Sequence, residues 1–337
     1  MVPVSVITGF LGSGKTTLIG RLLRDPSLAD TAVIVNEFGE IGLDHHLIAS
    51  SDETLIQLTT GCLCCAVRTD LVDTLLDLDA RRRRGEIGFA RVLIETSGIA
   101  DPAPILHALM TDAALAEAFT LGSVITLVDA ELGEATLAAH PEARRQVALA
   151  DRLVLTKTDR AAASAALLAT LAALNPAIAP QSVLASWHEV DPASLWHTAT
   201  RLPPTTQAPY AVHTSGIAST VVLRTEPVPA LALTLLIQAL AEHCGARLLR
   251  LKGLVDIAEL PGQPALIHGV QHVFAAPVWL DAWPSSDRHT RIVLIGQGIP
   301  RHFAARLLDA IVDEVQDETR RRKPSGNNPT APAPRGP

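Results

Sequence analysis

The sequence predicts an α/β fold with a mainly parallel sheet, followed by a smaller α+β domain. Over residues 1–200, short apolar runs alternate with helix-forming runs, as in chains that build a parallel sheet. The apolar runs are continuous, which is typical of strands covered on both faces. Pro203, Pro204 and Pro209 then separate this half from a second group of apolar segments. With 337 residues, the chain is long enough for both cores.

The expected elements of the first domain alternate in type. Strands are expected over residues 2–8, 32–36, 54–58, 91–95, 122–129, 152–156 and 179–184. Helices are expected over residues 15–24, 68–82, 103–119, 141–150 and 161–174.

The rest of the chain is expected to form a linker, a second domain and a tail. We expect the first domain to span residues 1–200, the linker 201–212, the second domain 213–319 and a disordered tail 320–337. In the second domain, strands are expected over residues 217–224, 247–257, 270–275 and 292–296, and helices over 230–243 and 300–319.

Composition argues against several classes of function. A net charge of −7 gives no reason to expect nucleic acid or an anionic membrane as a partner. The uncharged stretches 161–187 and 231–241 are interrupted by prolines or too short to cross a bilayer, so both are expected in the core of a soluble fold. The apolar N-terminus lacks a basic leader, so no signal peptide is expected and the location is expected to be cytoplasmic.

Residues 9–16 read Gly-Phe-Leu-Gly-Ser-Gly-Lys-Thr, which fits the phosphate-loop pattern G-x-x-x-x-G-K-[ST] between a strand and a helix. Glycines let backbone N–H groups curl around phosphates, and a helix N-terminus favours anions. Lys15 is expected to reach the β- and γ-phosphates, and the Thr16 hydroxyl to bind Mg²⁺. The pattern predicts a P-loop NTPase, with a structural glycine-rich turn as the alternative.

Two acids are expected to complete the phosphate site. Glu95 ends the apolar strand 91–95 and is expected to hold Mg²⁺ directly or through water, with Gly98 approaching the γ-phosphate. Glu37 follows the second expected strand, where P-loop GTPases keep a nucleotide-sensing switch. It is expected to contact Mg²⁺ or position the attacking water, with a solvated loop acid as the alternative. The catalytic candidates are therefore Lys15, Glu37 and Glu95, and the Mg²⁺ ligands Thr16, Glu37 and Glu95.

Residues 156–159, Thr-Lys-Thr-Asp, resemble the guanine-reading motif N-K-x-D, with Thr156 in place of the usual Asn. The Asp159 carboxylate can accept two hydrogen bonds from guanine N1 and N2. A buried Asp159 would stay unpaired against ATP, so GTP is favoured. The Lys157 stem can cover the base. Nucleotide contacts are expected from Gly9, Gly12, Ser13, Gly14, Lys15, Thr16, Thr17, Gly98, Thr156, Lys157 and Asp159.

The sequence Gly-Cys-Leu-Cys-Cys occupies residues 61–65. Cys62, Cys64 and Cys65 offer soft thiolates suited to Zn²⁺ or Cu(I). In an extended stretch Cys62 and Cys64 point to one side, and a turn can bring Cys65 round. One tetrahedral position stays open for water, His45, His46, a switch acid or a group from a partner. An open position suits the hand-over of a metal.

Other interpretations of the cysteines remain open: a structural zinc completed by a distant residue, a redox thiol cluster, or buried apolar side chains. The chain has four cysteines, and the clustering of three favours metal binding in a reducing compartment over a disulfide framework. Cys244 falls in an expected helix of the second domain and is interpreted as a core residue.

Together these motifs resemble the CobW-type metallochaperone GTPases, a family that includes cobalt, zinc and nitrile-hydratase-activator proteins. The resemblance covers about residues 3–315 and rests on residues 9–16, 36–42, 61–65, 95–102, 156–159, 250–253, 270–271 and 294–296. It implies GTP hydrolysis coupled to delivery of a metal to a client metalloprotein, with GTP, Mg²⁺ and Zn²⁺ or Co²⁺ bound. Pairing of two copies across the nucleotide is left open. Thr156 and the lack of a His-rich segment depart from the family pattern.

Two other classes of function remain open. A P-loop small-molecule kinase with a structural zinc would need an acceptor pocket and acceptor-dependent turnover. A non-catalytic assembly or redox scaffold would show negligible turnover even with metal. The leading hypothesis is that GTP-Mg²⁺ orders the Glu37 loop and thereby repositions the cysteines, while the second domain selects the client.

Overall fold

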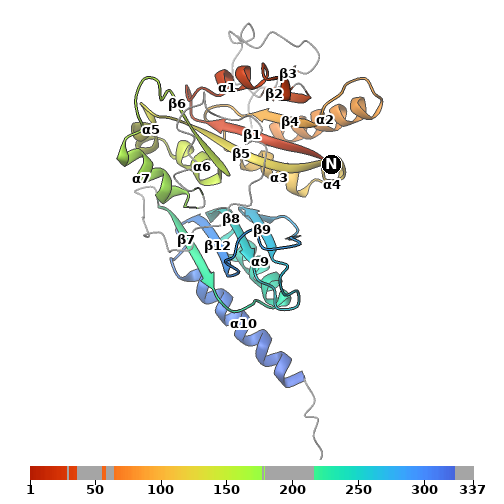
Figure 1. Cartoon of the computed structure of the whole chain (residues 1–337), viewed down its shortest axis with the longest axis vertical. Helices are drawn as coiled ribbons and strands as arrows, with labels where there is room; N and C mark the ends of the chain where they lie inside the picture. The colour runs from red at the N-terminus through yellow and green to blue at the C-terminus, as the bar shows by residue number, and fades with distance from the viewer. Residues whose placement is uncertain (29, 36–54, 58–63, 177, 179–215, 323–337) are drawn as a thin grey trace, which may run out of the picture.

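The computed structural model describes residues 1–28, 30–35, 55–57, 64–176, 178 and 216–322. These residues form two β-sheets, each with its own helices, and the second sheet packs against helices of the first domain (Figure 1). The strand expected over residues 179–184 and the expected linker lie outside the described residues.

The first sheet is parallel throughout its described strands, which run in the order β3-β2-β4-β1-β5-β6. Parallel strands end at one edge of a sheet, so the segments that follow β1, β4 and β6 meet there. These segments are the phosphate loop, the Glu95 segment and the Thr156 motif. The strands are β1 (Val2–Gly9), β2 (Thr31–Val35), β3 (Leu55–Gln57), β4 (Arg91–Glu95), β5 (Phe119–Asp129) and β6 (Arg152–Thr156).

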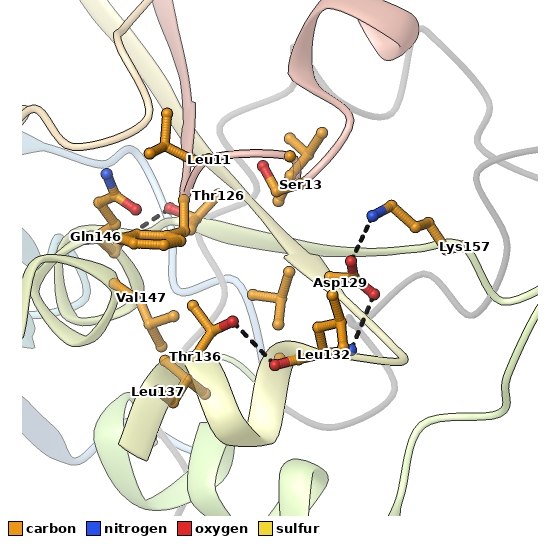
Figure 2. Close-up of a pocket in the computed structure, with 16 residues that line it drawn as sticks. Leu11, Ser13, Thr126, Asp129, Leu132, Thr136, Leu137, Gln146, Val147 and Lys157 are labelled. Carbon is orange, nitrogen blue, oxygen red and sulfur yellow. Dashed lines mark hydrogen bonds and ion pairs between the residues drawn. The ribbon is translucent and has the colours of Figure 1, made fainter. Parts of the chain in front are cut away.

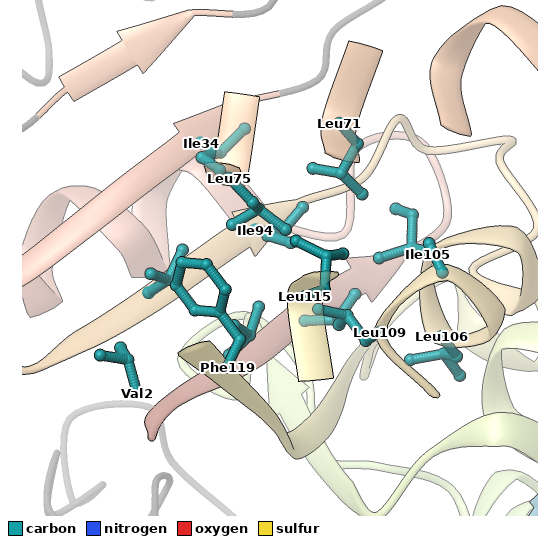
Figure 3. Packing of buried hydrophobic residues seen from close by; sticks show 14 of the residues in the cluster. Val2, Ile34, Leu71, Leu75, Ile94, Ile105, Leu106, Leu109, Leu115 and Phe119 are labelled. Carbon is teal, nitrogen blue, oxygen red and sulfur yellow. The ribbon is translucent and has the colours of Figure 1, made fainter. Parts of the chain in front are cut away.

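Helices cover both faces of this sheet. On one face, α2, α3 and α4 pack against Val4, Val6 and Ile94, as Figure 3 shows for part of this cluster. Farther along the same face, α5, α6 and α7 pack against Val128, Leu153 and Leu155, whereas on the other face α1 packs against Ile7 and Leu93. Neighbouring residues of one strand are therefore buried on opposite faces, which explains the continuous apolar runs and confirms the predicted fold class. The helices are α1 (Lys15–Leu22), η1 (Pro26–Leu28), α2 (Cys64–Arg83), α3 (Ala103–Thr111), α4 (Ala113–Ala118), α5 (Gly133–Ala139), α6 (Pro141–Leu149) and α7 (Ala165–Leu174).

The single helix expected over residues 103–119 is wrong. Asp112 has an extended conformation, with φ −77° and ψ 118°, and divides the segment into α3 and α4. Its carboxylate accepts hydrogen bonds from the backbone N–H groups of Ala114 and Leu115 at 3.0 and 3.1 Å. This local cap competes with a continuous helix, because it satisfies donors that the start of α4 leaves free.

The second domain is an antiparallel sheet in the order β10-β9-β8-β12-β7, with β11 also paired to β9. Helices α9 and α10 cover one face. The strand expected over residues 270–275 is wrong, because Gln271 has φ 53° and the chain turns back there between β9 and β10. The elements are β7 (Ile217–Arg224), α9 (Ala230–Cys244), η4 (Gly245–Arg247), β8 (Leu248–Val255), β9 (Ala265–Val270), β10 (Val273–Phe274), β11 (Val278–Trp279), β12 (Thr290–Gln297) and α10 (Phe303–Arg322).

The other face of the second sheet packs on α6 and α7 of the first domain. Ile217, Leu249 and Ile295 belong to the same buried cluster as Val147 of α6 and Leu171 of α7. The two domains therefore share one apolar core. Cys244 is 4% exposed in the core of the second domain, as expected. Across the described part of the chain, no helix is long and apolar enough to span a bilayer.

Candidate nucleotide-binding site

The phosphate loop connects β1 to α1 and has the backbone of an anion cradle. Gly9, Gly12 and Gly14 all have positive φ, at 146°, 71° and 91°. A Cβ at Gly9 would lie 2.6 Å from the Leu127 carbonyl oxygen, so a larger residue does not fit there. Gly14 is the N-cap of α1, so the N-terminus of that helix opens toward the loop. Such a helix start favours phosphate.

Lys15 bends back over the loop. Its ammonium donates to the carbonyl oxygens of Gly9 at 2.9 Å and Phe10 at 3.4 Å, and the residue is only 9% exposed. These carbonyls stabilise a cation at the mouth of the cradle. The charge is thereby available to phosphate oxygens, which are stronger acceptors than carbonyls.

Glu95 and Thr16 meet although they are 79 residues apart in the sequence. The Thr16 hydroxyl donates to Glu95 Oε1 at 3.1 Å, and Glu95 is 1% exposed at the end of β4. Beside them, Thr96 fixes β4 to β1 through its hydroxyl, which donates to Thr8 Oγ1 at 2.8 Å. A carboxylate and a hydroxyl next to a phosphate cradle are the hard oxygen donors that Mg²⁺ prefers. This donor set fits Mg²⁺.

The segment after Glu95 lies directly against the phosphate loop. A Cβ at Gly98 would lie 2.8 Å from the backbone N and Cα of Leu11, so this approach requires glycine. From the other side, Gln146 Nε2 donates to the carbonyl oxygens of Gly98 and Ala100, both at 3.1 Å. Asp101 accepts from Arg145 at 3.0 Å and from the Ala103 N–H at 2.9 Å at the start of α3.

Gln146 and Arg145 were not found from the sequence. Both lie on α6, and their partners are about 45 residues earlier in the chain. The sequence carries no motif at these positions that marks them as neighbours of the Gly98 segment.

The Thr156 motif follows β6 and contacts the phosphate loop. The Thr156 hydroxyl donates to the Ser13 carbonyl oxygen at 2.8 Å, so the residue that replaces the usual Asn still connects the two motifs. Lys157 has φ 57° and forms an ion pair with Asp129, with Nζ 2.5 Å from Oδ2. Burial alone would raise the pKa of Asp129. Lys157 and two backbone N–H groups stabilise the carboxylate by more than this, so the pKa lies below its ordinary value. Asp159 is exposed, unlike the buried acid that the argument for GTP assumed.

A cavity of about 100 Å³ opens between the phosphate loop, the end of β5, α5 and α6 (Figure 2). Figure 2 shows the ion pair of Lys157 and Asp129 at one side of it and Gln146 at the other. Nearby, Phe10 of the loop stacks on His140, with ring centroids 4.3 Å apart. The outer surface of the loop is thus supported by α5 and α6.

The predicted metal ligands lie mostly beyond what the structure describes. Cys62, Glu37, His45 and His46 are outside the described residues. The backbone of Cys64 and Cys65 is already helical, because α2 begins at Cys64 rather than near residue 68. The expectation of an extended stretch is therefore wrong at Cys64. Within the described residues, no group of three or more His, Cys, Asp or Glu side chains is placed to hold a metal.

A glycine-rich loop between a parallel strand and a helix, with a buried acid from the next strand on the loop's threonine, defines a P-loop nucleotide-binding protein. Residues 3–183 match the family described as CobW/HypB/UreG, nucleotide-binding domain, and residues 217–312 match the cobalamin synthesis protein cobW C-terminal domain. The chain belongs to the CobW/HypB/UreG family, and the resemblance predicted from its motifs is confirmed.

Several relatives have been given functional names. Zinc chaperone YjiA of Escherichia coli is 34% identical over 306 residues, which cover 89% of this chain and 95% of that protein. Zinc chaperone CobW of Pseudomonas aeruginosa is 40% identical over 151 residues, covering 42% and 39%. The crystal structure of Zn(II)-bound YjiA GTPase from E. coli superposes with a TM-score of 0.71 at 28% identity, covering 92% of this chain and 98% of that one.

Proposed function

We propose that the protein is a GTP-hydrolysing metallochaperone that binds zinc, or cobalt, at Cys62, Cys64 and Cys65 and transfers it to a client metalloprotein. The GTPase and metallochaperone predictions are confirmed at the level of the family, since a zinc chaperone and a zinc-bound GTPase match nearly the whole chain. The metal ligands, the client and the choice between zinc and cobalt belong to the proposal.

One structural observation carries the metal site. The segment from β3 to α2 leaves the carboxyl edge of the parallel sheet, because β3 is parallel to β2 and β2 to β4. Glu95 ends β4 at this same edge. The start of α2, with Cys64 and Cys65, therefore follows from the edge of the sheet that also carries the phosphate loop. A metal bound at the start of α2 would therefore lie close to the segments whose conformation depends on the bound nucleotide.

The residues divide the work of GTP hydrolysis as follows. Lys15 and the N–H groups of the phosphate loop hold the phosphates and stabilise the negative charge that develops on them. Thr16 and Glu95 would hold Mg²⁺, which neutralises phosphate charge when bound. Gly98 contacts the γ-phosphate through its backbone, and Glu37 orients the attacking water. Thr156, Lys157 and Asp159 select guanine, and a bound base would cover the Asp159 carboxylate, which is exposed.

Coupling would arise because the Glu37 segment and the cysteine segment follow neighbouring strands. Binding of GTP orders the first segment, and hydrolysis releases it, so the affinity of the thiolates for zinc changes with the nucleotide. The second domain would recognise the client, and two copies would pair across the nucleotide. A cytoplasmic location follows from the need for reduced thiols.

The test is a zinc titration of the purified protein with GTP plus Mg²⁺, with GDP plus Mg²⁺ and without nucleotide. We expect zinc affinity to differ at least about tenfold between the GTP and GDP states. The Cys62/Cys64/Cys65→Ser variant should lose this zinc, while Cys244→Ser, which changes a core cysteine of the second domain, should keep it. Equal affinity in all three nucleotide states would contradict the coupling, and zinc retained by the triple variant would contradict the site.

A further inference from the structure

The carboxamide of Gln146 supports the Gly98 turn from behind. Gln146 is 1% exposed, and its Nε2 donates to the carbonyl oxygens of both Gly98 and Ala100 at 3.1 Å. The opposite orientation of the amide would place its oxygen against two carbonyl oxygens, so these partners fix it. Leu11 of the phosphate loop touches the other side of Gly98. Gly98 is therefore held between the loop and Gln146.

The two ends of this segment are held by the Thr96 hydroxyl, which donates to Thr8, and by the ion pair of Asp101 with Arg145. Ile99, between the two carbonyls that Gln146 contacts, is 51% exposed. Gly98 has no side chain to pack. Between these ends, the two hydrogen bonds from Gln146 hold the carbonyl groups of Gly98 and Ala100.

Helix α6 gives Gln146 a fixed position. The Gln146 carbonyl oxygen accepts from the Thr126 hydroxyl of β5 at 2.9 Å. At the end of the helix, Asn175 Nδ2 donates to the carbonyl oxygens of Val147 at 2.9 Å and Ala150 at 3.0 Å. The same helix packs on β8 of the second domain. Because α6 is fixed on three sides, Gln146 is a rigid point against which the turn is aligned.

We propose that Gln146 is a positioning residue for GTP hydrolysis. Its two hydrogen bonds orient the Gly98 backbone toward the γ-phosphate before the nucleotide arrives, which is how a site preorganises charge stabilisation. GDP has no γ-phosphate, so Gln146 acts on the GTP state and on the reaction but not on GDP binding. The inference rests on the GTPase activity proposed above, and it does not depend on the cysteine site.

The experiment compares Gln146→Met, which keeps the length of the side chain but removes the donor, with the unchanged protein. We expect kcat for GTP to fall at least about tenfold and the affinity for a non-hydrolysable GTP analogue to fall several-fold, since two hydrogen bonds to the turn are lost. The affinity for GDP should stay within about twofold. GDP binding also reports that the variant is folded.

Two further variants sharpen the test. Gln146→Glu can donate only when its carboxyl is protonated, so its rate relative to the unchanged protein should rise as the pH falls. Gln238→Met removes a glutamine from the exposed face of α9 and should leave kcat and both affinities unchanged.

The outcomes separate the possible failures. Unchanged kcat in Gln146→Met, or an equal loss of GTP-analogue and GDP binding, would overturn the positioning role and leave only a packing role. If Gln146→Met does not fold, a flat relative pH profile of Gln146→Glu would overturn it instead. Absence of GTP hydrolysis in the unchanged protein would be a failure of the proposed function itself.

Discussion

Two buried carboxylates of the first domain, Glu95 and Asp151, have very different neighbours. Glu95 lies at the carboxyl edge of the parallel sheet beside the hydroxyl of Thr16, at 3.1 Å. Asp151 lies at the contact between the domains, where Arg250 and Lys252 of β8 approach its Oδ1 to 2.6 and 3.3 Å. At the domain contact, the protein supplies the cations itself. At the nucleotide site the chain brings a carboxylate and a hydroxyl together, and we propose that they hold the Mg²⁺ that accompanies the nucleotide.

This difference predicts that Asp151 serves the stability of the fold and Glu95 the reaction. Burial raises the pKa of Asp151, but Arg250, Lys252 and the N–H of Val124 outweigh it and hold the pKa well below its ordinary value. Asp151 is therefore charged and satisfied in the folded protein. Replacing it should affect stability, whereas replacing Glu95 should affect the reaction.

The largest effect is expected for the substitution Glu95→Gln, on kcat for GTP. The amide keeps the size of the side chain and can still accept from Thr16, but it is a poor ligand for Mg²⁺. We expect kcat for GTP to fall about a thousandfold at saturating Mg²⁺, which corresponds to about 4 kcal/mol. The free energy of unfolding should change little. Steady-state GTPase assays over a range of Mg²⁺ concentrations measure the first, and urea unfolding the second. A full rate in Glu95→Gln would mean that Glu95 is only a structural acid, like Asp151.

The second largest effect is expected for Asp151→Asn, on the free energy of unfolding. Arg250 is 5% exposed, so loss of the charge opposite it leaves a buried cation unmatched. We expect the free energy of unfolding to fall by about 3 kcal/mol, with kcat of the folded protein nearly unchanged. The matched control is Asp309→Asn, because Asp309 pairs with Arg224 at 2.7 Å but its side chain is 62% exposed. That surface pair should contribute less than about 1 kcal/mol. Equal losses in the two variants would remove the distinction between buried and exposed pairs.

The same comparison explains what could be predicted from the sequence. The phosphate loop and the acid at the end of β4 were predicted, because each is a short motif whose chemistry requires a fixed order of residues. The parallel sheet was predicted because continuous apolar strands need cover on both faces. Gln146 and Asp151 were not, because their partners are 48 and 99 residues away and their roles depend on tertiary contact.

Local competition accounts for the incorrect boundaries. At Asp112, a side-chain cap prevails over the helical pattern, and at Gln271 a left-handed turn divides an apolar run into a hairpin. Cys64 was expected in an extended segment, yet it starts α2, and nothing in the spacing of the cysteines indicates where that helix begins. The ligand set that includes Cys62 and Glu37 stays a prediction.

The smallest expected effect is a pH dependence of stability that arises from His268 at the domain contact. Burial, together with Arg250 and Lys252, lowers the pKa of His268 to about 4, although Asp151 opposes this shift. A histidine with a depressed folded pKa binds its proton more readily in the unfolded chain. Stability is therefore complete above about pH 6.5 and falls as the pH drops toward 4.

We expect this loss to be about 2 kcal/mol, smaller than the full shift would give because His268 is only partly buried. Asp151 is an acid, but its lowered pKa also makes the folded protein less stable as the pH falls. This loss begins only below about pH 4, where the carboxyl group of the unfolded chain takes up a proton. The two groups thus act in separate windows. Urea unfolding of the unchanged protein and of His268→Gln between pH 7 and 4.5 measures the first window alone. The glutamine variant should lose less stability than the unchanged protein over that range, and identical slopes would show that the pKa of His268 is not lowered in the folded protein.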